Sequence, residues 1–167
     1  MYQRILVPVD GSATAERGLA EAMQLCKLTG GRLRLIHVVD ELSFALSASE
    51  GMAFSGDVVD VLRESGTAIL GAAADRVRAS GLAVDTVLND SFQGRVCDLV
   101  VAQAGSWGAD LIVLGTHGRR GVGRLFMGSD AESIVRSATV TVLLLRAVPQ
   151  APAAPKWRRS GAEVAPK

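Results

Sequence analysis

Aromatic residues make up only 4% of this sequence, and its apolar residues are mainly Val, Leu, Ala and Ile. Proteins that bind single-stranded nucleic acids usually stack the bases on aromatic side chains, so this composition argues against such a surface. The net charge is only +1, which removes the electrostatic attraction that binding to DNA, RNA or an anionic membrane requires. We therefore expect neither a nucleic-acid partner nor a membrane partner.

Cysteines and long apolar runs are also scarce. The two cysteines, Cys26 and Cys97, have no metal-ligand spacing and fall inside helical patterns, so we interpret them as buried residues of a protein in a reducing compartment. No apolar stretch has the length of a transmembrane helix, and the run between Arg4 and Asp10 is too short for the core of a signal peptide. These features predict a soluble, cytoplasmic protein.

The remaining composition is that of one folded domain. Hydrophobic residues make up 49% of the 167 residues and charged residues 21%, which excludes disorder of the whole chain. The last residues differ, because Pro, Ala, Lys and Arg dominate there without any periodicity. We predict one folded domain over residues 1–148 and a disordered tail over 149–167.

Short apolar strands alternate with amphipathic helices along the chain. Strands are predicted over residues 4–9, 32–39, 83–89, 111–114 and 140–145, with a helical pattern in each interval between them. Residues 40–56 lack a clear pattern, and we predict a loop or a short irregular helix there. The order predicts a doubly wound α/β fold, a parallel sheet with helices on both faces. Such folds bind ligands beyond the carboxyl ends of the strands, where the strand order reverses.

A glycine-rich segment follows the fourth predicted strand. It reads Gly115-Thr116-His117-Gly118, then nine residues, then Gly128-Ser129 at the start of the last predicted helix. Glycines let backbone amides approach an anion, and a helix start adds free amides and the positive end of the helix dipole. The pattern therefore predicts a polyphosphate site. Neither a Walker P-loop nor a Gly-x-Gly-x-x-Gly dinucleotide motif occurs in the chain.

These motifs resemble the universal stress protein family over roughly residues 2–146. The likeness is carried by the opening run from Ile5 to Ser12, by the run from Asp110 to Gly118, and by Gly128-Ser129. In that family the pattern Gly-x2-Gly-x9-Gly-Ser/Thr marks the members that bind ATP. The resemblance implies a Rossmann-like, adenine nucleotide alpha hydrolase-like sheet of order 3-2-1-4-5. It also implies a homodimer that pairs through the last strand, Val140 to Leu145.

The resemblance further implies an ATP site with Mg²⁺. Asp10 would lie near the ribose or a phosphate-bound Mg²⁺, as the metal ligand, while Pro8 and the backbone at Val38 and Val39 would flank adenine. The residues expected at the nucleotide are Pro8, Val9, Asp10, Val38, Val39, Gly115, Thr116, His117, Gly118, Arg119, Gly128, Ser129 and Asp130.

Two positions depart from the family pattern. Asp130 stands where a small apolar residue is usual, and its carboxylate would repel a triphosphate unless Mg²⁺ intervenes. Thr141 stands where proline is common at the start of the last strand, which we expect to alter that edge mildly.

We expect an ATP-binding, stress-response regulatory module with no catalytic residues. One alternative is a slow ATPase or self-phosphorylating enzyme with Ser129 or another hydroxyl as acceptor, although no general base or catalytic lysine is in place for it. Another is a binding module for a different adenine nucleotide or phosphorylated ligand. Two further residues have structural interpretations: Ser12 as a helix N-cap, and His37 as a satisfied histidine in the core or near the site.

Overall fold

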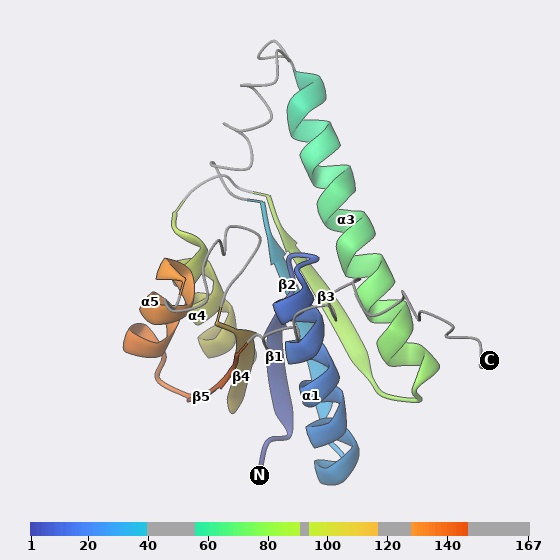
Figure 1. Cartoon of the computed structure of the whole chain (residues 1–167), viewed down its shortest axis with the longest axis vertical. Helices are drawn as coiled ribbons and strands as arrows, with labels where there is room; N and C mark the ends of the chain where they lie inside the picture. Colours follow the sequence, from blue (N-terminus) through green and yellow to red (C-terminus); the bar gives the residue numbers. More distant parts are fainter. Residues whose placement is uncertain (40–55, 91–93, 117–127, 147–167) are drawn as a thin grey trace, which may run out of the picture.

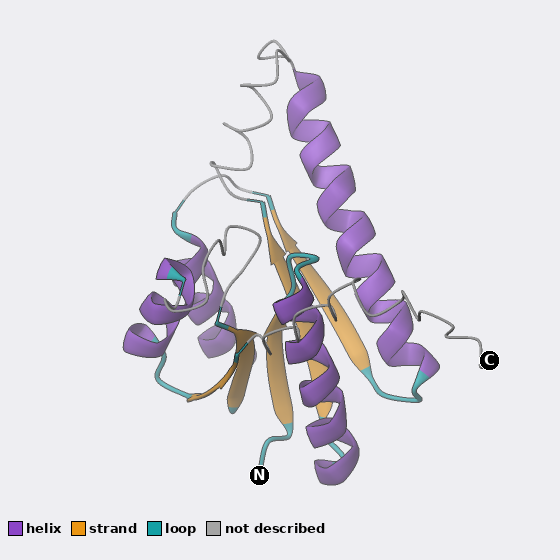
Figure 2. Ribbon diagram, in the orientation of Figure 1, coloured by secondary structure: helices purple, strands orange, loops and turns teal. Residues whose placement is uncertain are grey.

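The computed structural model describes residues 1–39, 56–90, 94–116 and 128–146. The five strands form one parallel sheet of order β3-β2-β1-β4-β5, and a helix lies between each pair of successive strands (Figures 1 and 2). The predicted fold class and strand order are confirmed. The elements are β1 (Arg4–Pro8), α1 (Ala13–Thr29), β2 (Arg32–Val38), α3 (Gly56–Ala79), β3 (Val84–Asn89), α4 (Val96–Trp107), β4 (Leu111–Gly115), α5 (Ser129–Ser137) and β5 (Thr141–Leu145).

The predictions for residues 40–55 and for the tail from residue 149 lie outside the described residues.

The sheet separates two hydrophobic cores. In β1, Ile5 and Val7 face α1 and α3, whereas Leu6 faces α4 and α5, and all three side chains are fully buried. Successive residues of a strand point to opposite faces, so an unbroken apolar run is what a sheet covered on both sides requires. Cys26 lies in the first core and Cys97 in the second, and both are buried free thiols, as predicted. None of the described helices is long and apolar enough to cross a membrane.

Helix α1 begins and ends at residues that the sequence identifies. The Ser12 hydroxyl accepts a hydrogen bond from the amide of Ala15 (3.2 Å), which confirms Ser12 as the N-cap. At the other end Gly30 adopts the left-handed conformation (φ 67°) and donates its amide to the Cys26 carbonyl. The two caps fix where the chain leaves β1 and where it enters β2.

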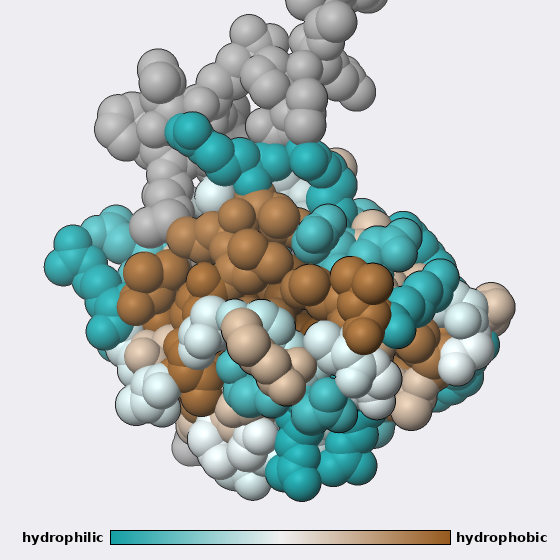
Figure 3. Space-filling model, turned by 90° about the horizontal axis from the view of Figure 1, so that it is seen from below, coloured by the Kyte–Doolittle hydropathy of each residue, from teal (hydrophilic) through white to brown (hydrophobic). Residues whose placement is uncertain are grey.

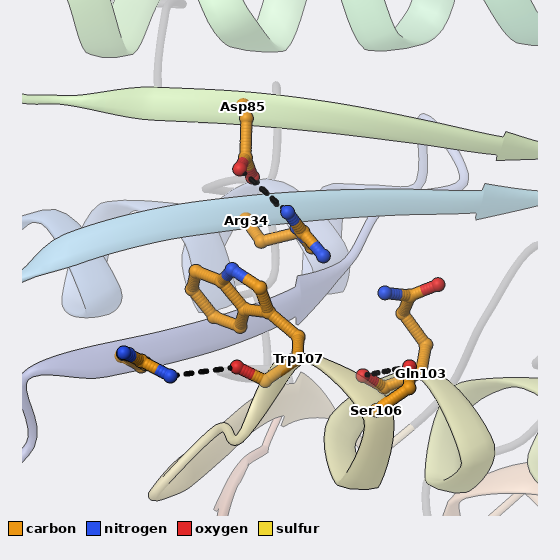
Figure 4. Close-up of polar contacts among 6 residues, drawn as sticks. Arg34, Asp85, Gln103, Ser106 and Trp107 are labelled. Carbon is orange, nitrogen blue, oxygen red and sulfur yellow. Dashed lines mark hydrogen bonds and ion pairs between the residues drawn. The ribbon is translucent and has the colours of Figure 1, made fainter.

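Helix α4 is anchored to the sheet by its last residue. The Arg34 guanidinium lies 4.6 Å from the centroid of the Trp107 ring, and it donates two hydrogen bonds to Asp85 at 2.8 and 2.7 Å (Figure 4). The hydrogen bonds to Asp85 raise the pKa of Arg34. Arg4 donates to the Trp107 carbonyl at 3.0 Å. Side chains of β1, β2 and β3 thus fix the C-terminal end of α4.

Strand β5 forms one edge of the sheet. Its only neighbour among the described strands is β4, and its residues Val142 to Leu145 are apolar but only half-buried. Seen from below, the molecule presents a broad apolar area in the middle of that face, bordered by hydrophilic residues (Figure 3). Apolar surface left uncovered in a single chain commonly marks contact with another protein.

Candidate functional site

The candidate site lies at the carboxyl ends of the parallel strands, toward the top of Figure 1. The strand order reverses between β1 and β4, because β2 and β3 lie on one side of this pair and β5 on the other. The described residues predicted at the nucleotide all fall at this end, after β1, after β2, at the end of β4 and at the start of α5. His117, Gly118 and Arg119 lie outside the described residues.

The chain turns sharply after β1. One carboxylate oxygen of Asp10 accepts a hydrogen bond from the amide of Ser12 at 2.9 Å, and Gly11 between them has φ 78°. This positive φ is one that glycine adopts without strain. Asp10 is half-buried, at the point where the strand order reverses. Its carboxylate therefore shapes the turn into α1 at the place where we predict the ligand.

The ends of β1, β2 and β3 are joined by backbone hydrogen bonds. The amide of Val9 donates to the Ile36 carbonyl (2.9 Å), and the amide of Val39 donates to the Asn89 carbonyl (2.8 Å). Val9 and Val39 are buried, whereas Pro8 and Val38 are half-buried. Pro8, Val38 and Val39, which we predict to flank adenine, thus lie with Val9 at an apolar end of the sheet.

Thr116 ties together the segments that follow β4. Its amide donates to the Leu145 carbonyl, and its carbonyl accepts from the amide of Gly128, both at 2.8 Å. The two ends of the segment 117–127 are therefore joined by a hydrogen bond. The amides of Thr116 and Gly128 both donate hydrogen bonds within the fold. Of the Gly128-Ser129 pair, the predicted phosphate donor must therefore be the amide of Ser129.

Gly115 has a packing role that the sequence does not reveal. A Cβ atom at this position would lie 2.7 Å from Thr14 Cβ and 2.9 Å from the Thr14 carbonyl carbon. Thr14 is buried in the first turn of α1, and its hydroxyl lies 3.1 Å from that of Ser12. The missing side chain of Gly115 lets α1 approach the end of β4, which brings the turn at Asp10 close to the phosphate motif.

Helix α5 begins without a side-chain cap. Its N-cap Gly128 has φ −61° and ψ 147°, and the first intrahelical hydrogen bond is donated by Glu132 to the Gly128 carbonyl (3.0 Å). The amides of Ser129, Asp130 and Ala131 precede that bond, as the first amides of a helix do. Amides at the positive end of a helix dipole suit an anion such as a phosphate.

Asp130 places a carboxylate in the first turn of α5, and Arg95 lies at the N-cap of the adjacent helix α4. Arg95, at the N-cap of α4, donates two hydrogen bonds to Asp98, both 2.9 Å, and its side chain is 71% exposed. Hydrogen bonding to Asp98 raises the pKa of Arg95, and the charge of Asp130 raises it further. The hydrogen bonds from Arg95 lower the pKa of Asp98. Helices α4 and α5 lie side by side (Figure 1).

Sequence reasoning missed Arg95. It follows Gly94, which has φ 86°, after the third strand of the chain. The rule that ligands bind beyond the carboxyl ends of parallel strands applies to this loop too.

Among the described residues, no group of three or more His, Cys, Asp or Glu side chains is placed to hold a metal ion. Mg²⁺ in nucleotide sites is commonly held by one or two carboxylates together with substrate phosphates and water. Asp10 is the carboxylate that we predict as the protein's ligand in such a site.

Three comparisons place the chain among known proteins. The sequence model of the universal stress protein family matches residues 1–146. Universal stress protein A homolog 2 of Coxiella burnetii is 32% identical over 150 residues, which are 87% of this chain and 95% of that protein.

Two solved structures extend the likeness to the fold. A protein of the universal stress protein family from Burkholderia pseudomallei has a TM-score of 0.67 at 31% identity, over 87% of this chain and 97% of its own. A universal stress protein in complex with cAMP has a TM-score of 0.60 at 25% identity, over 86% of this chain and 97% of its own.

Proposed function

Because the chain belongs to the universal stress protein family, we propose that it is an ATP-binding regulatory protein of the stress response, working in the cytoplasm as a nucleotide-dependent dimer. The observation that carries the proposal is the junction of the Asp10 turn, the apolar ends of β1 and β2, and the uncapped start of α5. One end of the sheet would thus give a base an apolar boundary and a phosphate the first amides of α5.

The triphosphate would meet α5 through the amides of Ser129, Asp130 and Ala131. Each contact with a helix dipole contributes about 0.3–1 kcal/mol. Micromolar affinity corresponds to about −8 kcal/mol, so the base pocket and the segment with Gly118 must contribute as well. Mg²⁺ would be held by Asp10 and the phosphates, and it would reduce the repulsion between the triphosphate and Asp130.

Calorimetric titration with ATP, with and without Mg²⁺, tests the proposal. We expect micromolar binding by the wild type, and its loss in the double variant Gly118→Ala/Gly128→Ala. The control is Gly71→Ala, on α3, where an added Cβ meets no atom within 4 Å. Folded wild-type protein that binds no adenine nucleotide would refute the proposal. Phosphate release measured in the same samples would reveal slow hydrolysis.

Asp130→Asn tests the metal dependence separately. Removing the carboxylate should raise the affinity for ATP without Mg²⁺ more than the affinity with Mg²⁺. Equal effects in the two conditions would mean that Asp130 does not face the phosphates.

A second candidate ligand is cAMP, because a relative of the same fold was solved with it. A monophosphate uses the base pocket but needs fewer phosphate donors. Titrations with ATP, AMP and cAMP therefore distinguish the candidates: tightest binding of ATP supports the first proposal, and tightest binding of cAMP supports the second.

The dimer would form through β5, whose outer edge has no strand beside it among the described residues and whose side chains are apolar and half-buried. Open edges of sheets and uncovered apolar side chains are surfaces that pair with other chains. Sedimentation equilibrium of the wild type and of Leu143→Lys measures this directly, with a dimer expected only for the wild type. A monomeric wild type would refute it.

A further inference from the structure

The His37 side chain contacts the end of β1, next to the Asp10 turn. It is a residue of β2 that is only 7% exposed, and its Nδ1 atom lies 2.7 Å from the Val9 carbonyl oxygen. A carbonyl oxygen only accepts hydrogen bonds, so Nδ1 carries the hydrogen. The prediction that His37 is a satisfied histidine is confirmed.

Helix α3 holds the other side of the imidazole ring. A Cβ atom at Gly66 would lie 2.8 Å from His37 Cδ2 and 3.3 Å from Nε2, and 2.8 Å from Leu88 Cδ1. Gly66 is buried, and its lack of a side chain allows α3 to pack directly on the ring. The ring is therefore confined between the Val9 carbonyl and α3.

Val9 occupies the position where β1 ends and the site begins. Its amide donates to the Ile36 carbonyl, and its carbonyl accepts from the His37 side chain, so both polar groups of the Val9 backbone are bonded to β2. The next residue, Asp10, forms the turn that leads to Ser12. We propose that His37 is a positioning residue, which fixes Val9 and thereby the Asp10 turn against β2 and α3 in the geometry that binds the nucleotide. This inference rests on the proposed nucleotide site.

Two substitutions at His37 separate the hydrogen bond from the shape of the ring. His37→Phe keeps a ring without a donor, and it leaves the Val9 carbonyl without this bond. His37→Asn keeps an N–H group near the position of Nδ1. With a fluorescent ATP analogue, we expect His37→Phe to raise the Kd about tenfold, as loss of a hydrogen bond to a buried group would. His37→Asn should remain within about threefold of the wild type.

Helix α3 supplies a second, independent pair. Gly66→Ala should displace the ring and weaken binding, whereas Gly71→Ala on the same helix should leave the Kd unchanged. A purely structural role predicts instead that Asn and Phe weaken binding in proportion to their loss of thermal stability. Phe binding as well as the wild type, or Asn binding as weakly as Phe at equal melting temperature, would overturn the proposal.

Hydrogen exchange at the Ser12 amide tests the same inference without any nucleotide. Its bond to Asp10 reports the turn, so exchange should be faster in His37→Phe than in the wild type and nearly restored in His37→Asn. If the wild type binds no adenine nucleotide, the proposed function fails, while this measurement still decides whether His37 holds the turn. Unchanged exchange in His37→Phe would overturn the inference.

Discussion

Gly115 offers the sharpest test of how the phosphate motif is built. If its lack of a side chain served only the ligand, Gly115→Ala would fold as well as the wild type and lose only affinity. The structure predicts a different result, because the new Cβ would lie 2.7 Å from Thr14 Cβ and 2.9–3.0 Å from the Thr14 carbonyl group. Non-bonded carbons pack at about 3.5–4.0 Å, so α1 must move away from β4.

Crowding of this kind in a packed region costs about 1–3 kcal/mol. Gly115 is not among the residues with positive φ, so alanine fits the backbone and regains about 0.4–1 kcal/mol from the unfolded state. We therefore expect a net loss of about 1–2 kcal/mol. In a chain of this size that lowers the melting temperature by about 2–8 °C, which thermal unfolding followed by circular dichroism resolves.

Gly18→Ala is the matched control, since Gly18 lies on α1 against the same end of β4. A Cβ there would lie 3.7 Å from the nearest atoms of Leu114 and Gly115, which is ordinary contact. Alanine is favoured over glycine inside a helix by about 1 kcal/mol, so this variant should be as stable as the wild type or more so. The reasoning is refuted if Gly115→Ala melts no lower than the wild type, or if both variants lose equal stability.

Two further predictions concern groups outside the site. Cys26 and Cys97 are 0% and 1% exposed, and burial raises the pKa of both thiols, so a disulfide reagent at neutral pH should label native protein only as fast as the fold opens. Instant labelling of one thiol would contradict this. The hydrogen bond from Arg63 lowers the pKa of Asp90. This ion pair therefore stabilises the fold at pH values above the ordinary carboxyl pKa, and the stabilisation disappears as the pH falls through the lowered pKa of Asp90. Urea titrations should find Asp90→Asn less stable than the wild type at neutral pH, with the difference shrinking in acid; a constant difference would rule out this pair as its source.

The fold was predictable because local sequence patterns specify its strands and helices. The run from Ile5 to Val7 is apolar at every position, as a strand buried on both faces must be, and Ser12 and Gly30 cap α1 as their chemistry suggests. The end of the sheet that carries the candidate site follows from the parallel order alone. Sequence therefore gave the architecture and placed Asp10, Val39 and Ser129 at one end of it.

The finer roles depend on contacts between distant parts of the chain. Thr14 packs where a side chain of residue 115 would lie, and the Thr116 amide donates a hydrogen bond to the Leu145 carbonyl. The charge of Asp130 on α5 acts on Arg95 at the N-cap of α4. No local pattern encodes such pairings, because they arise only when the crossovers bring separate loops to the same edge.

The hydrogen bond between Thr116 and Gly128 also bears on how this fold can diversify. It joins the two ends of segment 117–127 directly, next to the link from Thr116 to Leu145. Doubling the length of a loop whose ends are held costs only about 0.6 kcal/mol in closure entropy. A change in the length of this segment should therefore cost the fold little stability and leave the sheet unchanged.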